Sequence, residues 1–102
     1  MQKADYKKYY SIINYAIANN HMKDNNLSIA FNYCRDIIKH NPTFVPAYNM
    51  LIQNEFNSKN ITKVTKYLQK LWLVEQSYEA ILLFNQYYIH FFMLNKQPKK
   101  HK

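Results

Sequence analysis

The feature that most limits the fold of this 102-residue chain is the complete absence of glycine. Tight hairpins, β-bulges and phosphate-binding loops depend on glycine, because it enters the region of positive φ without a steric cost. The sequence is therefore a poor candidate for an all-β fold or for a nucleotide-binding loop. Hydrophobic residues make up 48% of the chain and charged residues 20%, which is typical of one globular domain.

Apolar residues recur at intervals of three and four, which is typical of amphipathic helices. We expect five helices, over about residues 5–19, 27–40, 46–56, 61–74 and 78–94. Asn26 and Ser77 are the expected N-caps of the second and fifth helices. The first helix is expected to bury Tyr6, Tyr9, Tyr10, Ile13, Ala16 and Ile17. The fourth is expected to bury Trp72. Helices joined by short turns pack as antiparallel neighbours, so the predicted fold class is all-α.

The apolar pattern repeats along the chain at a constant spacing. The pairs related in this way are Ile17 and Leu51, Ala30 and Val64, Cys34 and Leu68, and Ile37 and Leu71. The spacing is about 34 residues and holds two helices, which is the period of the tetratricopeptide-repeat (TPR) family. The chain therefore resembles this family, and we call the spacing the repeat period. An ordinary helical bundle with a chance period is the alternative.

The resemblance implies a TPR-like α-solenoid of antiparallel helix–turn–helix repeats over residues 4–94, followed by a basic disordered tail over residues 95–102. The first repeat spans about residues 11–44 and has the small residues and the terminal proline of the family: Ala18, Ala30 and Pro42. The second, over about residues 45–78, is degenerate. The fifth helix would begin a third repeat.

A narrower resemblance covers about residues 28–90. The run from Asn41 to Tyr48, followed by Lys66 and by Lys70-Leu71-Trp72, is similar to the repeat region of HemY-type TPR proteins. Those proteins are longer and have N-terminal transmembrane helices, which are not found in this sequence. This resemblance implies a truncated piece of such a protein, for which neither a membrane anchor nor a link to porphyrin metabolism follows.

Motifs for catalysis or for metal binding are missing from the sequence. The four histidines, His21, His40, His90 and His101, are widely separated, and no HExxH or CxxC motif occurs. The lone Cys34 lies on an expected buried face, where a free cysteine behaves as a small hydrophobe. We therefore expect no enzyme activity, no cofactor and no metal. A single cysteine also suits a reducing compartment, so the expected location is cytoplasmic, with association to a membrane as an option.

The formal net charge is +8. Lys59, Lys63, Lys66 and Lys70 are spaced so that they form a basic stripe along the fourth helix. The stripe is either a solvated outer face or a binding surface for an anionic partner, namely nucleic acid or anionic lipid. The single arginine, Arg35, argues against sequence-specific readout of bases, which favours guanidinium groups.

The TPR resemblance also implies a groove lined by the first helix of each repeat. The positions carried over to this sequence are Ile12, Tyr15, Asn19, Asn49, Gln53 and Phe56. Amide and aromatic side chains suit an extended peptide, because amides can pair with its backbone. The alternative is that Asn49 and Gln53 are merely exposed polar residues.

The fifth helix is apolar on all sides, which is normal only for a helix that is covered on all sides. The exposed apolar residues expected on it are Phe84, Tyr88, Phe91, Phe92 and Met93. A solenoid normally ends in a helix with a polar outer face, so this surface is expected to need a cover. Self-association into a homo-oligomer and a protein partner are both candidates.

These observations favour a non-catalytic, protein-binding helical-repeat scaffold with a protein or peptide partner. Two alternatives stay open. One is a basic module that binds nucleic acid or an anionic membrane surface through the stripe. The other is a degenerate remnant of a longer HemY-type protein.

Overall fold

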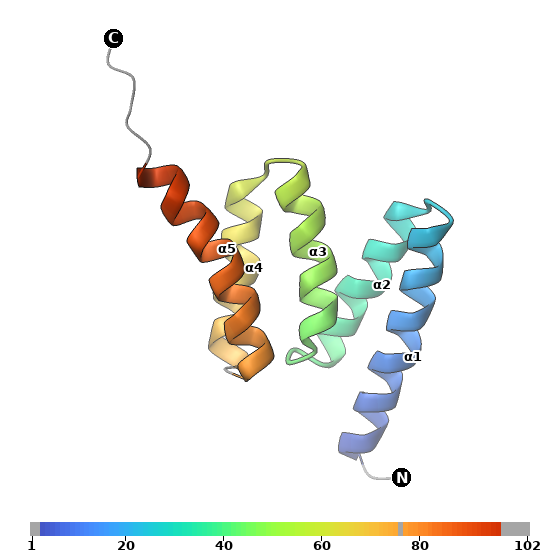
Figure 1. Ribbon diagram of the computed structural model, residues 1–102. Coiled ribbons are helices and arrows are strands. Elements are labelled where there is room, and N and C mark those ends of the chain that lie inside the picture. The colour runs from blue at the N-terminus through green and yellow to red at the C-terminus, as the bar shows by residue number, and fades with distance from the viewer. Residues whose placement is uncertain (1–2, 76, 97–102) are drawn as a thin grey trace.

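The computed structural model describes residues 3–75 and 77–96, with the side chains of residues 5–75, 77–87 and 89. All regular structure in these residues is helical. The helices are α1 (Lys3–Lys23), α2 (Leu27–His40), α3 (Val45–Asn57), α4 (Ile61–Val74) and α5 (Tyr78–Lys96). Each runs antiparallel to the one before it (Figure 1). The all-α prediction is therefore confirmed, and the predicted bounds of α2 and α4 are those observed.

The helices pack in chain order. α1 lies on α2, α2 on α3 and α3 on α4, while α5 contacts both α3 and α4. The core between them is formed mainly by α2, α3 and α4, whose inner faces are apolar. Cys34 at its centre lies 3.2 Å from the Met50 sulfur, and burial raises the pKa of this thiol to about 11. It is therefore a packing residue, because the thiolate is the reactive form of cysteine.

The repeat period reappears in the geometry. α2 and α4 have the same length, and both their first and their last residues are one repeat period apart. Fully buried residues recur at the same spacing, as in Ala18 and Ile52 or Ala30 and Val64. The chain thus folds as two successive helical hairpins that match in spacing, followed by α5.

The turns that close α1 and α3 have the same conformation. Asn25 and Lys59, one repeat period apart, adopt φ values of 62° and 61°. In each turn the next amide donates a hydrogen bond back into the helix: Asn26 to the His21 carbonyl and Asn60 to the Glu55 carbonyl, both over 2.8 Å. This is the Schellman motif, which normally has glycine at the position of positive φ. The fold therefore forms left-handed turns without glycine.

The buried side of α1 differs from the prediction. Tyr6 and Ile13 are exposed over 61% and 58% of their surface, and Tyr9 and Ala16 are exposed as well. The helix instead buries Ser11, together with Ala18, which is one of the small residues expected from the repeat. The reason is that α1 extends past the far end of α2, and no other described helix lies on its outer side (Figure 1). Tyr15 and Met22 of α1 are partly buried and also pack against the core.

Buried Ser11 is satisfied on both sides. Its hydroxyl donates to the Lys7 carbonyl over 2.8 Å and accepts from the side-chain amide of Asn41 over 3.0 Å. Asn41 follows α2, so this bond ties the α2–α3 loop to α1. A polar residue is buried here because its hydrogen bonds are satisfied, which an apolar pattern does not reveal.

The two predicted N-caps differ in outcome. Ser77 caps α5, because its hydroxyl accepts a hydrogen bond from the Ala80 amide over 3.2 Å. Asn26 stands at the N-cap of α2 but its side chain makes no capping hydrogen bond. The Asn26 backbone amide is already used by the Schellman turn, which fixes the residue without its side chain.

The C-terminal part of the prediction needs two changes. Trp72 is exposed over 40% of its surface, where burial was expected, because α5 covers only part of it; the Phe84 ring lies 5.2 Å away between centroids. α5 continues to Lys96, so residues 95 and 96 of the predicted tail are helical. The rest of that tail lies outside the described residues.

Candidate functional site

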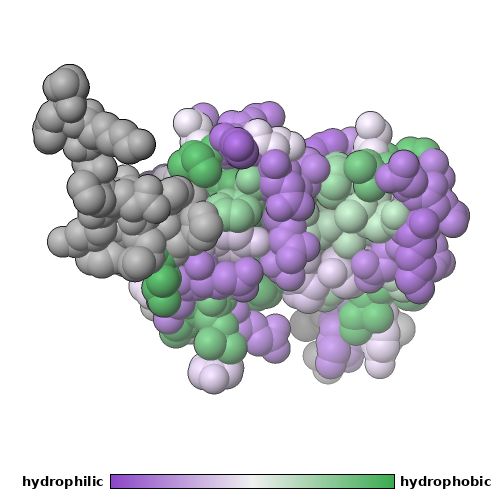
Figure 2. Space-filling view, turned by 45° about the horizontal axis from the view of Figure 1, so that its top comes forward, coloured by the Kyte–Doolittle hydropathy of each residue, from purple (hydrophilic) through white to green (hydrophobic). Residues whose placement is uncertain are grey.

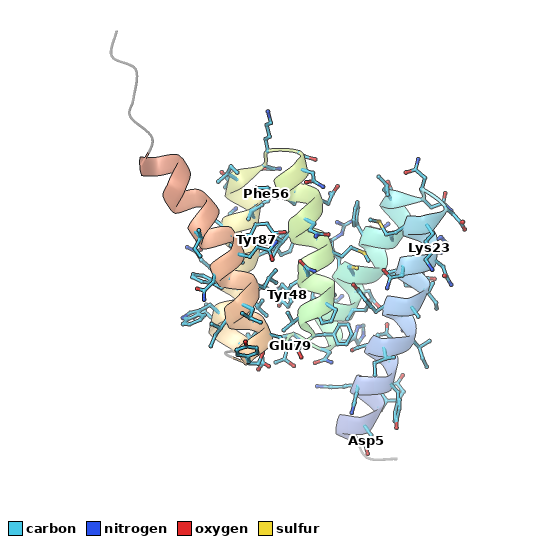
Figure 3. The ribbon with its side chains drawn as sticks, in the orientation of Figure 1. Asp5, Lys23, Tyr48, Phe56, Glu79 and Tyr87 are labelled. Atoms are coloured by element: carbon cyan, nitrogen blue, oxygen red, sulfur yellow. The ribbon has the colours of Figure 1, made fainter. Side chains whose placement is uncertain are left out.

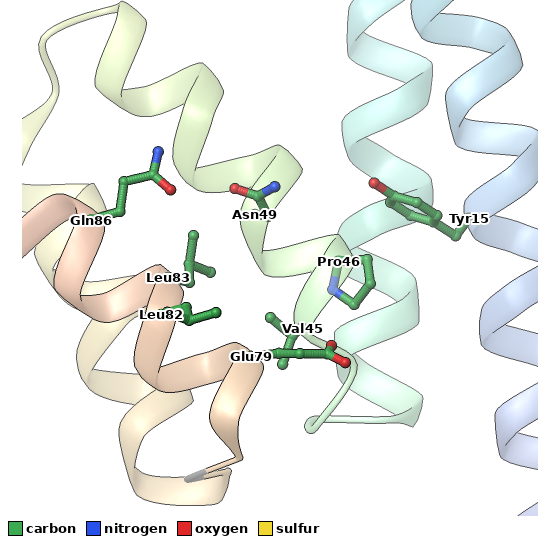
Figure 4. Close-up of a pocket in the computed structure, with 8 residues that line it drawn as sticks. All are labelled: Tyr15, Val45, Pro46, Asn49, Glu79, Leu82, Leu83 and Gln86. Atoms are coloured by element: carbon green, nitrogen blue, oxygen red, sulfur yellow. The ribbon is translucent and has the colours of Figure 1, made fainter.

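Helices α1, α3 and α5 together line a hollow of about 340 Å³, which we call the α1–α3–α5 hollow (Figure 4). α1 contributes Tyr15, α3 contributes Val45, Pro46 and Asn49, and α5 contributes Glu79, Leu82, Leu83 and Gln86. Four of the lining residues are aliphatic and one is aromatic, and the others are two amides and one carboxylate. This is the composition of a site that holds an apolar side chain and pairs with a neighbouring backbone.

Equivalent positions of the three helices meet in this hollow. Tyr15, Asn49 and Leu83 follow one another at intervals of one repeat period, and Val45 and Glu79 are related in the same way. Successive helical hairpins therefore present the same positions to one surface. In Figure 4 the Tyr15 ring extends towards α3, and Glu79 reaches from α5 towards Val45 and Pro46.

Tyr15 is held in place by its surroundings. Its ring packs edge-on against Phe44, with centroids 5.7 Å apart. Burial raises the pKa of its hydroxyl, while a hydrogen bond with Asn19 acts in the opposite direction. The hydroxyl is therefore protonated at neutral pH and can donate a hydrogen bond to a ligand.

The other predicted groove residues lie outside this hollow. Ile12 and Gln53 are exposed, and Asn19 is half-buried beside Tyr15. Phe56 packs on Tyr87 of α5 with ring centroids 5.2 Å apart, so it joins α3 to α5 (Figure 3).

Of the six predicted groove residues, the structure brings Tyr15 and Asn49 together in the hollow. The lining residues that the sequence analysis missed are Val45 and Pro46 of α3 and Glu79, Leu82, Leu83 and Gln86 of α5. The repeat period could have found Leu83, because this residue follows the predicted Asn49 by one period.

Three lysines of the basic stripe line a second hollow of about 490 Å³, the basic hollow. Its lining residues are Arg35 of α2, Glu55 of α3, and Lys63, Lys66, Tyr67 and Lys70 of α4. Lys59, the fourth predicted member of the stripe, stands in the turn before α4 and does not line it. Arg35 was not predicted at this site, because only the packing of the helices brings it there.

Apolar side chains are exposed around the α4–α5 turn. Leu73 and Tyr78 are largely open to solvent, and Figure 2 shows one face of the molecule on which hydrophobic patches are divided by hydrophilic ones. Phe84 is half-buried against Trp72. The other four residues predicted to form an exposed apolar surface on α5, Tyr88, Phe91, Phe92 and Met93, lie outside the described side chains.

Polar groups near the start of α1 join this helix to α2. The Tyr10 hydroxyl donates a hydrogen bond to the Asp36 carboxylate, and the Tyr10 ring lies 5.1 Å from the His40 ring. The bond to Asp36, helped by burial, raises the pKa of Tyr10 to about 12. Asp36 also lies 3.5 Å from the His40 ring nitrogen. These contacts fasten the two helices.

No group of three or more His, Cys, Asp or Glu side chains in the described part of the chain is placed to hold a metal ion. Among those same residues, no helix has the length and apolar character needed to cross a membrane.

Comparison of the chain with protein-family models, with curated protein sequences and with solved structures finds no match. The class that the described residues define is an all-α protein of antiparallel helical hairpins related by one repeat period.

Proposed function

We propose that this protein is a non-catalytic, TPR-like scaffold that binds an extended segment of a partner protein in the α1–α3–α5 hollow. The observation that supports this most directly is the recurrence of Tyr15, Asn49 and Leu83, one from each helix, in one hollow. A surface made from equivalent positions of stacked hairpins is the usual binding surface of a solenoid. The HemY-type resemblance remains a proposal about ancestry and adds no ligand.

The chemistry of the hollow specifies the segment. Leu82 and Leu83 offer an aliphatic wall for one apolar side chain. Asn49 and Gln86 can each donate to and accept from a peptide backbone in extended conformation. Glu79 is the one charged residue in the lining, and it forms no ion pair with the described residues. We therefore propose that the segment has a lysine or arginine beside its apolar residue.

The net charge of +8 does not prevent this choice. Exposed charges are screened beyond about 8–10 Å at physiological ionic strength, so a bound cation interacts mainly with Glu79. Glu79→Gln is expected to lower the affinity for a peptide with Lys beside its apolar residue. The affinity for the matching peptide with Gln at that position should not change.

A peptide-display library provides the test. We expect selection on the immobilised protein to enrich peptides with an apolar residue next to Lys or Arg. Fluorescence anisotropy of a selected peptide should then show that Asn49→Ala weakens binding about tenfold, because the peptide backbone loses its amide partner in the hollow.

Gln53→Ala is the matched control, because Gln53 lies one turn further along α3 and is exposed outside the hollow. It should leave the affinity unchanged. Equal losses for the two variants, or a library from which no peptide is enriched, would contradict the proposal.

A further inference from the structure

The two helical hairpins have a corresponding hollow on α2 and on α4. The hollow on α2 is lined by Ile29, Asn32, Tyr33 and Asp36. The positions one repeat period later are Lys63, Lys66, Tyr67 and Lys70, which are the α4 residues of the basic hollow. Both hollows have a tyrosine at the equivalent position. The other three positions are apolar, amide and acidic in the hollow on α2, and all three are lysines in the basic hollow. The positive charge is therefore a property of the second hollow alone.

The cations of the basic hollow outnumber its one carboxylate by four to one. Within the described part of the chain, Arg35, Lys63, Lys66 and Lys70 form no ion pair. Like charges three and four residues apart destabilise a helix slightly, so the three lysines oppose the folding of α4. The carboxylate of Glu55 accepts a hydrogen bond from the side-chain amide of Asn60 over 3.2 Å. It offsets one of the four positive charges and leaves an excess of three.

Arg35 and Tyr67 add directional donors. The Arg35 guanidinium donates to the Asn32 side chain over 2.6 Å, which uses one of its donors and orients the group. Tyr67 packs edge-on against Tyr48, with centroids 6.5 Å apart, and its hydroxyl forms no hydrogen bond with the described residues. A planar guanidinium, three ammonium groups and a phenol around one hollow are suited to phosphate oxygens.

We propose that the basic hollow binds a compact ligand with two or three phosphate groups. Each phosphate monoester has a charge of about −1.5 to −2 at neutral pH, so two such groups match the excess of three positive charges. A volume of about 490 Å³ suits a small molecule. An extended polyanion is disfavoured, since the corresponding hollow on α2 would present it with Asp36 and no lysine.

Isothermal titration calorimetry with sodium triphosphate tests the proposal, with sodium sulfate at the same ionic strength as the reference anion. We expect triphosphate to bind at least about tenfold more tightly than sulfate, since each added charged hydrogen bond contributes at this level. Lys66→Gln with Lys70→Gln should lower the affinity for triphosphate at least about tenfold. All of these lysines are exposed, so the variants should fold, which circular dichroism will check.

The control is Lys7→Gln with Lys8→Gln, which removes the same charge from exposed positions of α1. It should change the affinity less than about twofold, because these lysines act only through the screened long-range field. Equal losses in the two double variants would overturn the proposal, and so would triphosphate binding no tighter than sulfate.

Two further arms identify the source of the phosphates. Vesicles of phosphatidylcholine with a phosphorylated phosphatidylinositol should compete with triphosphate if the ligand is a lipid headgroup, and should not compete if it is a free phosphate compound. A single-stranded oligothymidylate that binds more tightly than triphosphate and is insensitive to Lys66→Gln with Lys70→Gln would overturn the proposal in favour of nucleic acid. The peptide test concerns the other hollow, so either proposal can fail alone.

Discussion

At the scale of single residues, the most informative side chain is Tyr48. Its ring is packed inside the helical core with 0% exposure (Figure 3), and its hydroxyl is buried without a hydrogen-bond partner among the described residues. Burial raises the pKa of this hydroxyl, since the charged form would lose its solvation. A buried polar group without a partner costs about 1–3 kcal/mol.

Tyr48→Phe should therefore stabilise the protein, by about 1 kcal/mol, because the ring keeps its packing while the hydroxyl is removed. Urea unfolding followed by circular dichroism measures the free energy of unfolding. Tyr33→Phe is the control, since Tyr33 is only half-buried and its hydroxyl can reach water. A Tyr48→Phe variant less stable than the wild type would show that the hydroxyl has a partner, such as an ordered water.

At the scale of elements, the turns determine where the helices end. The left-handed conformation costs a non-glycine residue about 1–2 kcal/mol, although asparagine tolerates it better. The first turn has Asn25 at that position and the second has Lys59. The second turn is therefore the more strained of two equivalent turns.

Lys59→Gly should raise the free energy of unfolding by about 1 kcal/mol, because it removes the steric cost of the left-handed conformation. The greater conformational entropy of glycine in the unfolded chain offsets only part of this gain. Asn25→Gly at the equivalent position should give a smaller gain. Lys59→Ala separates strain from charge, because alanine keeps the steric cost and removes the ammonium group. Equal stabilisation by Lys59→Ala and Lys59→Gly in urea unfolding would contradict the role of strain.

The elements also show what the sequence can predict. The bounds of α4 were predicted correctly from the apolar spacing of its residues. The buried face of α1 was not, because Tyr6, Tyr9 and Ile13 form a good apolar stripe that meets no neighbour. The spacing of apolar residues shows which face of a helix is apolar, and only tertiary packing decides whether another helix covers that face.

The candidate sites follow the same rule. Tyr15 and Asn49 could be predicted, since the repeat pattern aligns their helices, and Leu83 follows from the same period. Arg35 could not be assigned to the basic hollow, because it lies on α2 and reaches the α4 lysines only through the fold. Residues related by the repeat are accessible from sequence, and those joined across hairpins are not.

At the scale of the whole molecule, charge is poorly balanced. The net charge is +8 with histidines neutral, and the one acid–base side-chain contact within the described residues, His40 with Asp36 at half-exposed positions, is an ion pair only when His40 is protonated. Added salt therefore screens much repulsion and little attraction.

Raising NaCl from about 0.01 M to about 0.15 M shortens the screening length from about 30 Å to about 8 Å. The urea midpoint of the wild type should rise with NaCl. The midpoint of the Lys7→Gln, Lys8→Gln double variant should rise less, because this variant has a lower net charge. Midpoints that fall with salt would instead mean that attractive pairs dominate.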